Sequence, residues 1–411
     1  MRVLMLTELY PPFIGGSEQH VRNLSRGLVA RGHDVTVATM AADNMESIED
    51  DEGVRVHRVA STTRRLPDVL TPSGRPYVPP FPDPDVVSSI KRIVEDKEPD
   101  VVHAHNWMVH SFLPLKRQGD AKLVMTLHDY GIECAKKSLI YRDRPCSGPG
   151  FSKCLHCAAR HYGTARAEII TLGNWATQRP LRASVDMFLP VSEAVARGNS
   201  LDRDGVAYEV IPNFVPDDVA TEGADPDADE AVGGDLAQLP NEPFWLYVGT
   251  LSHHKGVQVL LDAYESLQGA PPLVIIGRRS PDGPQSFPEG TLVLYDMPHV
   301  DVMAVWRRAT LGIVPSLFPD PCPTVALEAM ACGVPLVGSR AGGLPEIIDE
   351  GKTGLLFDVG DTDGLAGALA TMRDDPARLL EMSDAARTRA GLFMASNVIG
   401  RIESVYSRLV S

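Results

Sequence analysis

Short apolar runs rich in Val, Ile and Leu alternate with helical stretches along almost the whole of this 411-residue chain. This alternation is typical of parallel α/β sheets that helices cover on both faces. It predicts doubly wound, Rossmann-like domains. The predicted strands lie near 2–7, 34–39, 54–59, 100–104, 122–127, 187–191, 207–211, 244–249, 272–277, 291–295, 311–315, 334–338 and 355–357.

Two domains are expected from the length and from one acidic break. A chain of 411 residues is too long for a single hydrophobic core. Residues 214–242 have no apolar period, and 217–242 hold nine Asp or Glu without any Lys or Arg, which predicts a flexible linker. We therefore expect one domain over 1–213, a second over 243–395 and a final helix over 396–411. Ligands of such sheets bind outside the carboxyl ends of the strands, so the predicted site is a cleft between two facing domains.

Charge narrows the classes of partner. The formal net charge is −15, and residues 214–411 carry 13 Lys or Arg against 28 Asp or Glu, whereas 1–213 carry 26 of each kind. Because nucleic-acid binding depends on neutralising phosphates, we expect no nucleic-acid partner. The near-neutral first half leaves peripheral contact with an anionic membrane open. The absence of an apolar run of about twenty residues, and a start that resembles a buried strand, predict a cytoplasmic protein without a transmembrane segment.

Residues 318–338 are the most informative for chemistry. They predict a loop carrying Asp320, a helix from Thr324 with Glu328 one turn in, a stop at Gly333, and a buried strand. A helix N-terminus beside carboxylates suits a phosphate together with a sugar hydroxyl, which indicates a nucleoside diphosphate. An ordinary βα unit with solvated acids is the alternative.

The first strand of each half is followed by a turn that can bind phosphate. Gly15 and Gly16 precede a helix, and because they lack Cβ atoms a diphosphate can approach their backbone N–H groups closely. Lys255 follows the first strand of the second half, where its ammonium can contact a phosphate. An ordinary glycine turn and a solvated loop lysine are the alternatives.

With these features in order, the chain resembles the retaining nucleotide-sugar glycosyltransferases of the GT-B fold, specifically family four, over essentially its whole length. Supporting stretches lie at 31–37, 100–105, 210–213 and 342–346. The resemblance implies transfer of a sugar from a nucleoside-diphosphate sugar to a hydroxyl of a glycan, lipid or small molecule. It also implies that the last helix crosses back onto the first domain. The donor base (UDP, GDP or ADP), the sugar, the acceptor and the oligomeric state stay open.

The resemblance places five positions at the donor diphosphate. Gly15 and Gly16 are implied to approach it through their backbone, and Lys255 through its ammonium group. The backbone N–H groups of Thr324 and Val325 are implied to reach the distal phosphate. Each of these positions matches the family's pattern in this sequence.

Other positions are implied to contact the nucleoside and the transferred sugar. Glu328 matches an acid that bonds the ribose hydroxyls, and Met297 is expected near the base. Asp320 and His128 match residues that lie at the transferred sugar, although the family's first acid is usually Glu rather than Asp.

One donor-site position departs from the family, which often has Arg where this chain has Thr250. We expect Lys255 or Arg278 to supply the positive charge that this arginine gives to the diphosphate site of the family. We place both Thr250 and Arg278 among the donor-binding residues.

The implied chemistry is a front-face substitution in which the departing diphosphate helps to deprotonate the acceptor. Lys255, backbone N–H groups and helix ends stabilise the leaving group, so no divalent ion is needed and no cofactor is expected for catalysis. A retaining hydrolase needs two flanking carboxylates, whereas both acids identified here are committed to the donor. The alternatives are a GT-B epimerase or phosphorylase, and a non-catalytic nucleotide-sugar-binding subunit.

Four cysteines gather within residues 131–162, an insertion of the first domain that starts shortly after His128. The last two have the Cys-x2-Cys spacing of zinc ligands. A structural zinc ion would order a segment that cannot form its own core, on the acceptor side of the domain. Free thiols, an iron–sulfur cluster and a disulfide are the alternatives. The four residues are Cys134, Cys146, Cys154 and Cys157.

Overall fold

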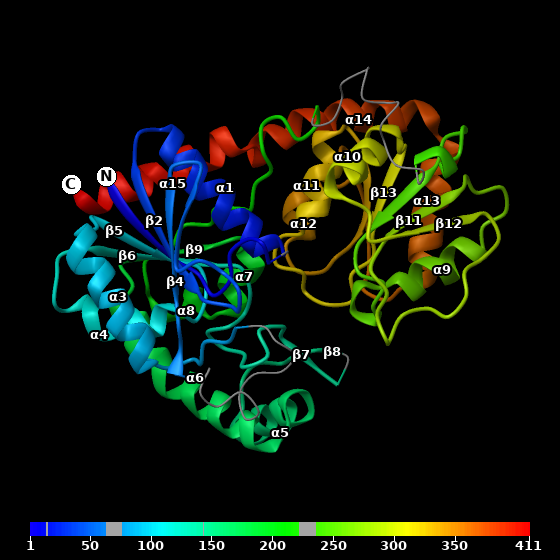
Figure 1. Cartoon of the computed structure of the whole chain (residues 1–411). Coiled ribbons are helices and arrows are strands. Elements are labelled where there is room, and N and C mark those ends of the chain that lie inside the picture. The colour runs from blue at the N-terminus through cyan, green and yellow to red at the C-terminus, as the bar shows by residue number, and fades with distance from the viewer. Residues whose placement is uncertain (14, 63–75, 143, 222–235) are drawn as a thin grey trace. The chain divides into compact units, whose positions relative to one another are not determined.

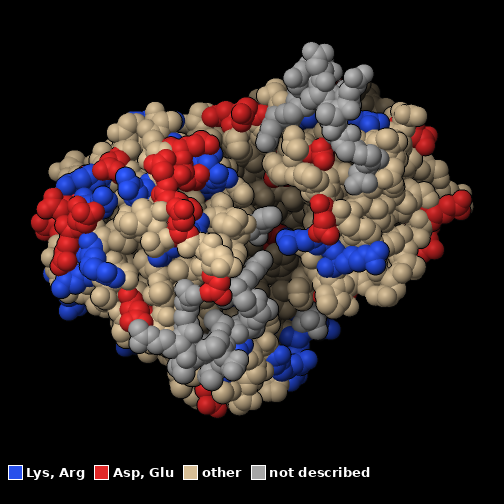
Figure 2. Space-filling view, viewed as in Figure 1, with Lys and Arg blue, Asp and Glu red and all other residues tan. Residues whose placement is uncertain are grey.

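A computed structural model of the chain describes residues 1–13, 15–62, 76–142, 144–221 and 236–411. The chain forms two compact units, each with a parallel sheet of its own (Figure 1). Unit 1 comprises Met1–Pro212 and Val398–Ser411, and unit 2 comprises Asn213–Asn397. Among the described residues, no helix combines the length and the apolar character needed to cross a membrane. On the face shown in Figure 2, acidic and basic side chains are intermingled rather than gathered into one basic stripe.

Unit 1 is built on a seven-stranded sheet in the order β3-β4-β2-β1-β5-β6-β9. Neighbouring strands are parallel, apart from β3, which runs antiparallel to β4. From β1 the chain adds strands first on one side and then, with β5, on the other, so the topological switch point lies between β1 and β5. The strands are β1 (Arg2–Leu6), β2 (Asp34–Met40), β3 (Ile48–Asp51), β4 (Val54–Val59), β5 (Val101–Ala104), β6 (Lys122–Leu127) and β9 (Met187–Pro190).

Helices surround this sheet, and α5 lies outside them, packed against α6 (Figure 1). The helices of unit 1 before the last one are α1 (Gly16–Ala30), α3 (Pro84–Lys97), α4 (Val109–Lys116), α5 (Phe151–Tyr162), α6 (Thr164–Ser184), α7 (Glu193–Gly198) and α8 (Leu201–Asp204). Between β6 and α5 lies a small hairpin of β7 (Ile140–Tyr141) and β8 (Arg144–Pro145).

Unit 2 repeats the plan with a six-stranded parallel sheet in the order β12-β11-β10-β13-β14-β15. Its switch point lies between β10 and β13. The strands are β10 (Trp245–Val248), β11 (Leu273–Gly277), β12 (Thr291–Tyr295), β13 (Leu311–Val314), β14 (Leu336–Ser339) and β15 (Gly354–Phe357). The helices are η3 (Leu236–Gln238), η4 (His253–Lys255), α9 (Val257–Glu265), α10 (His299–Arg308), α11 (Thr324–Ala331), α12 (Leu344–Ile347), α13 (Thr362–Asp374), α14 (Pro376–Ala390) and η5 (Gly391–Phe393).

Strands near each switch point are buried along nearly their whole length, which explains their continuous apolar sequences. Val3 to Leu6 of β1 and all of β5 and β13 are buried. A strand covered by helices on both faces excludes water from both sets of side chains, so alternation with polar residues is lost. The helix predicted from Thr324 is α11, and the strand predicted near 334–338 is β14.

Some local expectations differ from the structure. Residues 207–211 pair with β9 through three backbone hydrogen bonds and a parallel bridge between Tyr208 and Phe188, but they do not form a continuous strand. At the two ends of the segment expected to be a linker, 214–242, the side chains of Phe214, Val219 and Leu239 are buried. Its central residues, 222–235, lie outside the described part of the chain.

The last helix, α15 (Ala395–Val410), joins unit 1 through a buried polar contact. The hydroxyl of Tyr406 lies 2.5 Å from Nδ1 of His103, whose Nε2 lies 2.7 Å from the hydroxyl of Thr126. All three side chains are buried. Buried polar atoms cost stability when they lack a partner, so this contact fixes the helix at one place on the sheet.

We predict that Tyr406→Phe destabilises the protein by about 1–2 kcal/mol, because Nδ1 of His103 loses its hydrogen-bond partner in a buried place. The measurement is chemical unfolding of both proteins at pH 7.5. Tyr208→Phe, at a partly exposed tyrosine, is the control and is expected to change stability by less than about 0.5 kcal/mol. Equal stability of Tyr406→Phe and the parent protein would show that the contact does not hold α15.

Candidate active site

In unit 2, an ion pair spans the switch point of the sheet. Lys255 follows β10 at the end of η4, and Asp320 lies in the loop between β13 and α11. Nζ of Lys255 lies 2.7 Å from Oδ2 of Asp320. The Asp320 side chain is 8% exposed and that of Lys255 34% exposed, so the carboxylate is covered while the ammonium still reaches solvent. The ammonium also lies 4.9 Å from the ring centre of Phe318.

Two glycines let the loops that carry this pair pack closely. Gly256 has φ +72°, and a Cβ atom there would lie 1.8 Å from the carbonyl oxygen of Pro315. Gly342 has φ +55°, and a Cβ atom would lie 2.0 Å from the carbonyl oxygen of Asp320. Both positions combine a left-handed backbone with no room for a side chain, so only glycine fits without rearrangement. The loops after β10, β13 and β14 are thereby held together around the Lys255–Asp320 pair.

Helix α11 begins beside this pair. Pro323 precedes its first residue, Thr324, and gives it no side-chain cap. The first backbone N–H groups of a helix have no partner within the helix, so those of Thr324 and Val325 are donors at the positive end of its dipole. One turn further on, Oε1 of Glu328 lies 3.2 Å from Nε2 of His299 at the start of α10. The Glu328 side chain is 12% exposed.

The three other predicted donor residues lie at the same edge of the sheet. Thr250 follows β10, Arg278 follows β11, and Met297 follows β12. Thr250 and Arg278 are exposed and Met297 is half-buried. The structure therefore brings all the residues of unit 2 that the sequence suggested to the carboxyl ends of parallel strands, where α/β sheets bind their ligands.

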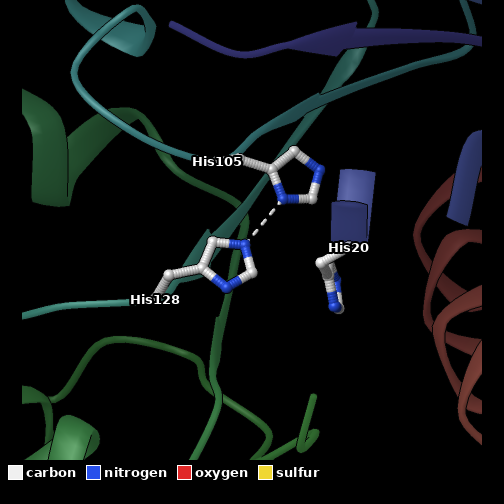
Figure 3. A group of neighbouring side chains, drawn as sticks. All are labelled: His20, His105 and His128. Carbon is white, nitrogen blue, oxygen red and sulfur yellow. Dashed lines mark hydrogen bonds between the residues drawn. The ribbon is translucent and has the colours of Figure 1, made fainter. Parts of the chain in front are cut away.

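In unit 1, three histidines converge at the corresponding edge (Figure 3). His20 comes from α1, His105 follows β5 and His128 follows β6. Nδ1 of His105 and Nε2 of His128 lie 3.1 Å apart, in a hydrogen bond, and their rings are stacked at 18°. The His20 ring meets that of His128 edge-on, with centroids 4.7 Å apart. One nitrogen of each histidine lies within 4.8 Å of the others, a spacing within which a metal ion can bind.

Burial keeps most of this group neutral. Loss of solvent lowers the pKa of His20 and of His105 well below its usual value, and lowers the pKa of His103, behind them, to about 3. Neutral imidazoles act as hydrogen-bond donors and acceptors rather than as cations. His128 is half-buried and therefore presents the accessible ring of the group.

A second polar contact joins the same edge to the cysteine-bearing segment. Glu8 follows β1, and its Oε1 lies 3.1 Å from the backbone nitrogen of Trp107 and 3.2 Å from Nζ of Lys137. The Lys137 ammonium also lies 4.1 Å from the centre of the Trp107 ring. Loss of solvent lowers the pKa of Lys137, but the carboxylates of Glu8 and Asp129 more than offset that effect, so the pKa is raised.

Gly15 and Gly16 lie at the N-terminus of α1, as expected from the sequence. Gly15 is the N-cap residue, without a side-chain cap, and a Cβ atom there would lie 2.2 Å from Oε2 of Glu18. The buried carboxylate of Glu18 therefore occupies the space beside Gly15. A Cβ atom on Gly16, in contrast, would meet no atom within 4 Å.

Sequence reasoning did not place Glu8, His20, His105 or Lys137 at the site. Glu8 and His105 could have been found, because each comes directly after a buried strand on one side of the switch point. His20 lies on α1, among apolar residues. Only the folded sheet brings this helix beside the ends of β5 and β6. Lys137 depends on a turn of the insertion that no sequence pattern indicates.

The comparisons with known proteins agree with one another. Residues 14–219 match the family model Glycosyltransferase Family 4, and residues 235–389 match Glycosyl transferases group 1. The chain is 28% identical to the glycogen synthase of Mycobacterium tuberculosis over 419 aligned residues, covering 95% of this chain and 90% of the relative. It is 27% identical to the D-inositol 3-phosphate glycosyltransferase of Pseudarthrobacter chlorophenolicus, covering 92% and 86%. The solved sucrose-phosphate synthase of Thermosynechococcus elongatus has TM-score 0.74, 21% identity and coverage of 99% and 98%.

The buried histidines make stability depend on pH. Folded His103, with its pKa lowered to about 3, stays neutral where the unfolded chain takes up a proton near the ordinary value of 6.5. The unfolded state then binds more protons, so stability falls as the pH falls through 6.5. At pH 5, His103 alone lowers the free energy of unfolding by roughly 2 kcal/mol.

We predict that His103→Gln reduces this loss between pH 7.5 and pH 5 by about that amount, roughly 2 kcal/mol. The measurement is urea unfolding at a series of pH values. His161→Gln, at an exposed histidine, is the control and should keep the full pH dependence. An unchanged slope in His103→Gln would contradict the neutral, buried state of His103.

Proposed function

Because the chain belongs to Glycosyltransferase Family 4 and has the GT-B fold, we propose that this glycosyltransferase moves a sugar from a nucleoside-diphosphate sugar to an acceptor hydroxyl with retention of configuration. The observation that carries the proposal is the Lys255–Asp320 pair beside the N-terminus of α11. It combines a cation, helix N–H donors and a carboxylate at one edge of one sheet. A diphosphate joined to a sugar has the complementary groups.

The donor part of the proposal rests on unit 2. A diphosphate accepts a charge-assisted hydrogen bond from Lys255 and further bonds from the N–H groups of Thr324 and Val325. Glu328, on the same helix, is placed to accept hydrogen bonds from ribose hydroxyls. Asp320 keeps Lys255 on its Oδ2 atom, and we assign its other carboxylate oxygen, Oδ1, to hydroxyls of the transferred sugar. Thr250, Arg278 and Met297 complete the site around the nucleoside.

The part of the proposal that concerns the sugar and acceptor rests on unit 1. His128 is the half-buried and therefore most accessible member of the histidine group, and we assign it the orientation of the transferred sugar. His105 is a positioning residue, because its hydrogen bond with His128 selects one orientation of that ring. We assign the backbone N–H groups of Gly15 and Gly16, at the start of α1, a role in binding the donor diphosphate. The two relatives are named for glycogen and for D-inositol 3-phosphate, so the acceptor class extends from a glycan to a small molecule.

The hydrogen bonds of the two acids support retention by front-face substitution. Asp320 forms an ion pair with Lys255, and Glu328 forms a hydrogen bond with His299. Neither carboxylate is therefore positioned to act as a nucleophile. A double displacement needs a carboxylate about 5–5.5 Å from a second one across the glycosidic bond. In the proposed step the bond from the sugar to the diphosphate breaks, the acceptor oxygen adds on the same face, and its proton passes to the departing phosphate. Lys255 and the helix N–H groups stabilise that phosphate, so a divalent ion is not required.

The test is a panel of UDP-, GDP- and ADP-sugars with hydroxyl acceptors, with Mg²⁺ added or EDTA present. We expect release of one nucleoside diphosphate, unchanged by EDTA, and a product whose anomeric configuration by NMR equals that of the donor. An inverted product or dependence on Mg²⁺ would contradict the mechanism. Isomerisation of the sugar from donor alone would indicate an epimerase, and binding without turnover for every acceptor would indicate a non-catalytic subunit.

A further inference from the structure

The four cysteines of the 131–162 segment line one small cavity of unit 1. All four are free thiols that are partly exposed, and all of them contribute to the same cavity of about 30 Å³. They come from three places in the chain. Cys134 lies in the turn after β6, Cys146 follows β8, and Cys154 and Cys157 lie one turn apart on α5.

The hairpin and α5 bring the four thiols to one cavity. Positions three apart on a helix lie on the same face, so Cys154 and Cys157 present both sulfur atoms to one side of α5. The backbone nitrogen of Cys146 donates to the carbonyl of Leu139 at 2.7 Å, which closes the β7–β8 hairpin and carries Cys146 beside the start of β7. The thiol of Cys157 lies 3.7 Å from the carbonyl of Ile140 in the same hairpin.

We propose that Cys134, Cys146, Cys154 and Cys157 bind one structural zinc ion. Four thiolates are a complete tetrahedral ligand set for zinc, and binding releases the thiol protons. The resulting centre carries two negative charges. Lys136 and Lys153 line the same cavity and offset them, and the backbone N–H of Gly150 donates to the sulfur of Cys154 at 3.3 Å.

The ligand set and the spacing of the thiols are the grounds for choosing zinc. Four thiolates can hold either zinc or an iron–sulfur cluster, and Cys154 and Cys157 have the Cys-x2-Cys spacing of zinc ligands. None of the four sulfur atoms is paired in a disulfide. Within the described residues, no three of these thiols come as close together as the histidine nitrogens do, so binding has to draw the hairpin and α5 together. The ion, with zinc–sulfur bonds of about 2.3 Å, then fills the space of the cavity.

The ion would order a segment with little core of its own. Ala158 is the buried residue of α5, whereas Phe151 at its start is 53% exposed. The segment is nevertheless joined to the candidate site, since the backbone nitrogen of Lys137 donates to the carbonyl of Cys134 and the Lys137 ammonium contacts Glu8. Zinc at Cys134 therefore fixes the turn from which Lys137 reaches the edge of the sheet.

The experiment measures metal and backbone protection in the full chain, so it does not depend on the proposed transferase activity. Protein purified without added metal is analysed for zinc, iron and sulfide. We expect about one zinc per chain and no iron, with loss of zinc in Cys154→Ser/Cys157→Ser. Cys332→Ser, at a cysteine of unit 2, and His105→Gln, in the histidine group, are matched controls that should retain zinc.

The second readout is hydrogen exchange of residues 131–162. Removal of zinc with a mercurial and then a thiol should speed exchange there, and added zinc should restore protection. This cycle uses the parent protein, so it decides the matter even where the double variant does not fold. Iron with sulfide, zinc that persists in the double variant, zinc lost on His105→Gln, or no protection on adding zinc would each overturn the proposal.

Discussion

The ion pair between Lys255 and Asp320 is the contact on which the site in unit 2 depends. A carboxylate that is 8% exposed is costly to keep ionised unless a cation compensates it, and Lys255 at 2.7 Å does so. The pair joins the loops that follow β10 and β13, the strands on either side of the switch point. Gly256 and Gly342 allow these loops to approach, and helix α11 starts where they meet. The same lysine is still accessible enough to be shared with a ligand phosphate.

The two units use different physical means at equivalent edges of their sheets. Unit 2 presents a lysine, helix N–H groups and carboxylates, which suit a charged diphosphate and hydroxyl groups. Unit 1 presents a histidine group in which burial keeps His20 and His105 neutral, with the Glu8–Lys137 pair beside it. Neutral imidazoles donate and accept hydrogen bonds without adding charge, which suits the hydroxyl groups of a sugar. This division of properties is the physical basis of the roles proposed for the units.

Much of the fold could be predicted from the sequence, because buried parallel strands have continuous apolar runs. The predicted family, GT-B fold and enzyme class are confirmed by the comparisons. Strand β3 was missed because its sequence, Ile-Glu-Asp-Asp, is acidic, and it pairs at the sheet edge where one side faces water. The hairpin of β7 and β8 is too short to leave a pattern. Strand-end residues in unit 2 were found through their motifs, whereas His20 and Lys137 depend on contacts that only the folded chain creates.

The most direct test of the central claim is calorimetric titration of the full chain with UDP, GDP and ADP. The account predicts that Lys255→Met weakens binding of the preferred nucleoside diphosphate by about 10–100-fold, the range for one charge-assisted hydrogen bond. Lys352→Met, at a lysine whose side chain is 73% exposed, should bind as the parent does. The double variant Lys255→Met/Asp320→Asn removes any repulsion by an unpaired carboxylate and should still bind weakly. Unchanged affinity in Lys255→Met would contradict the assignment of this edge as the diphosphate site.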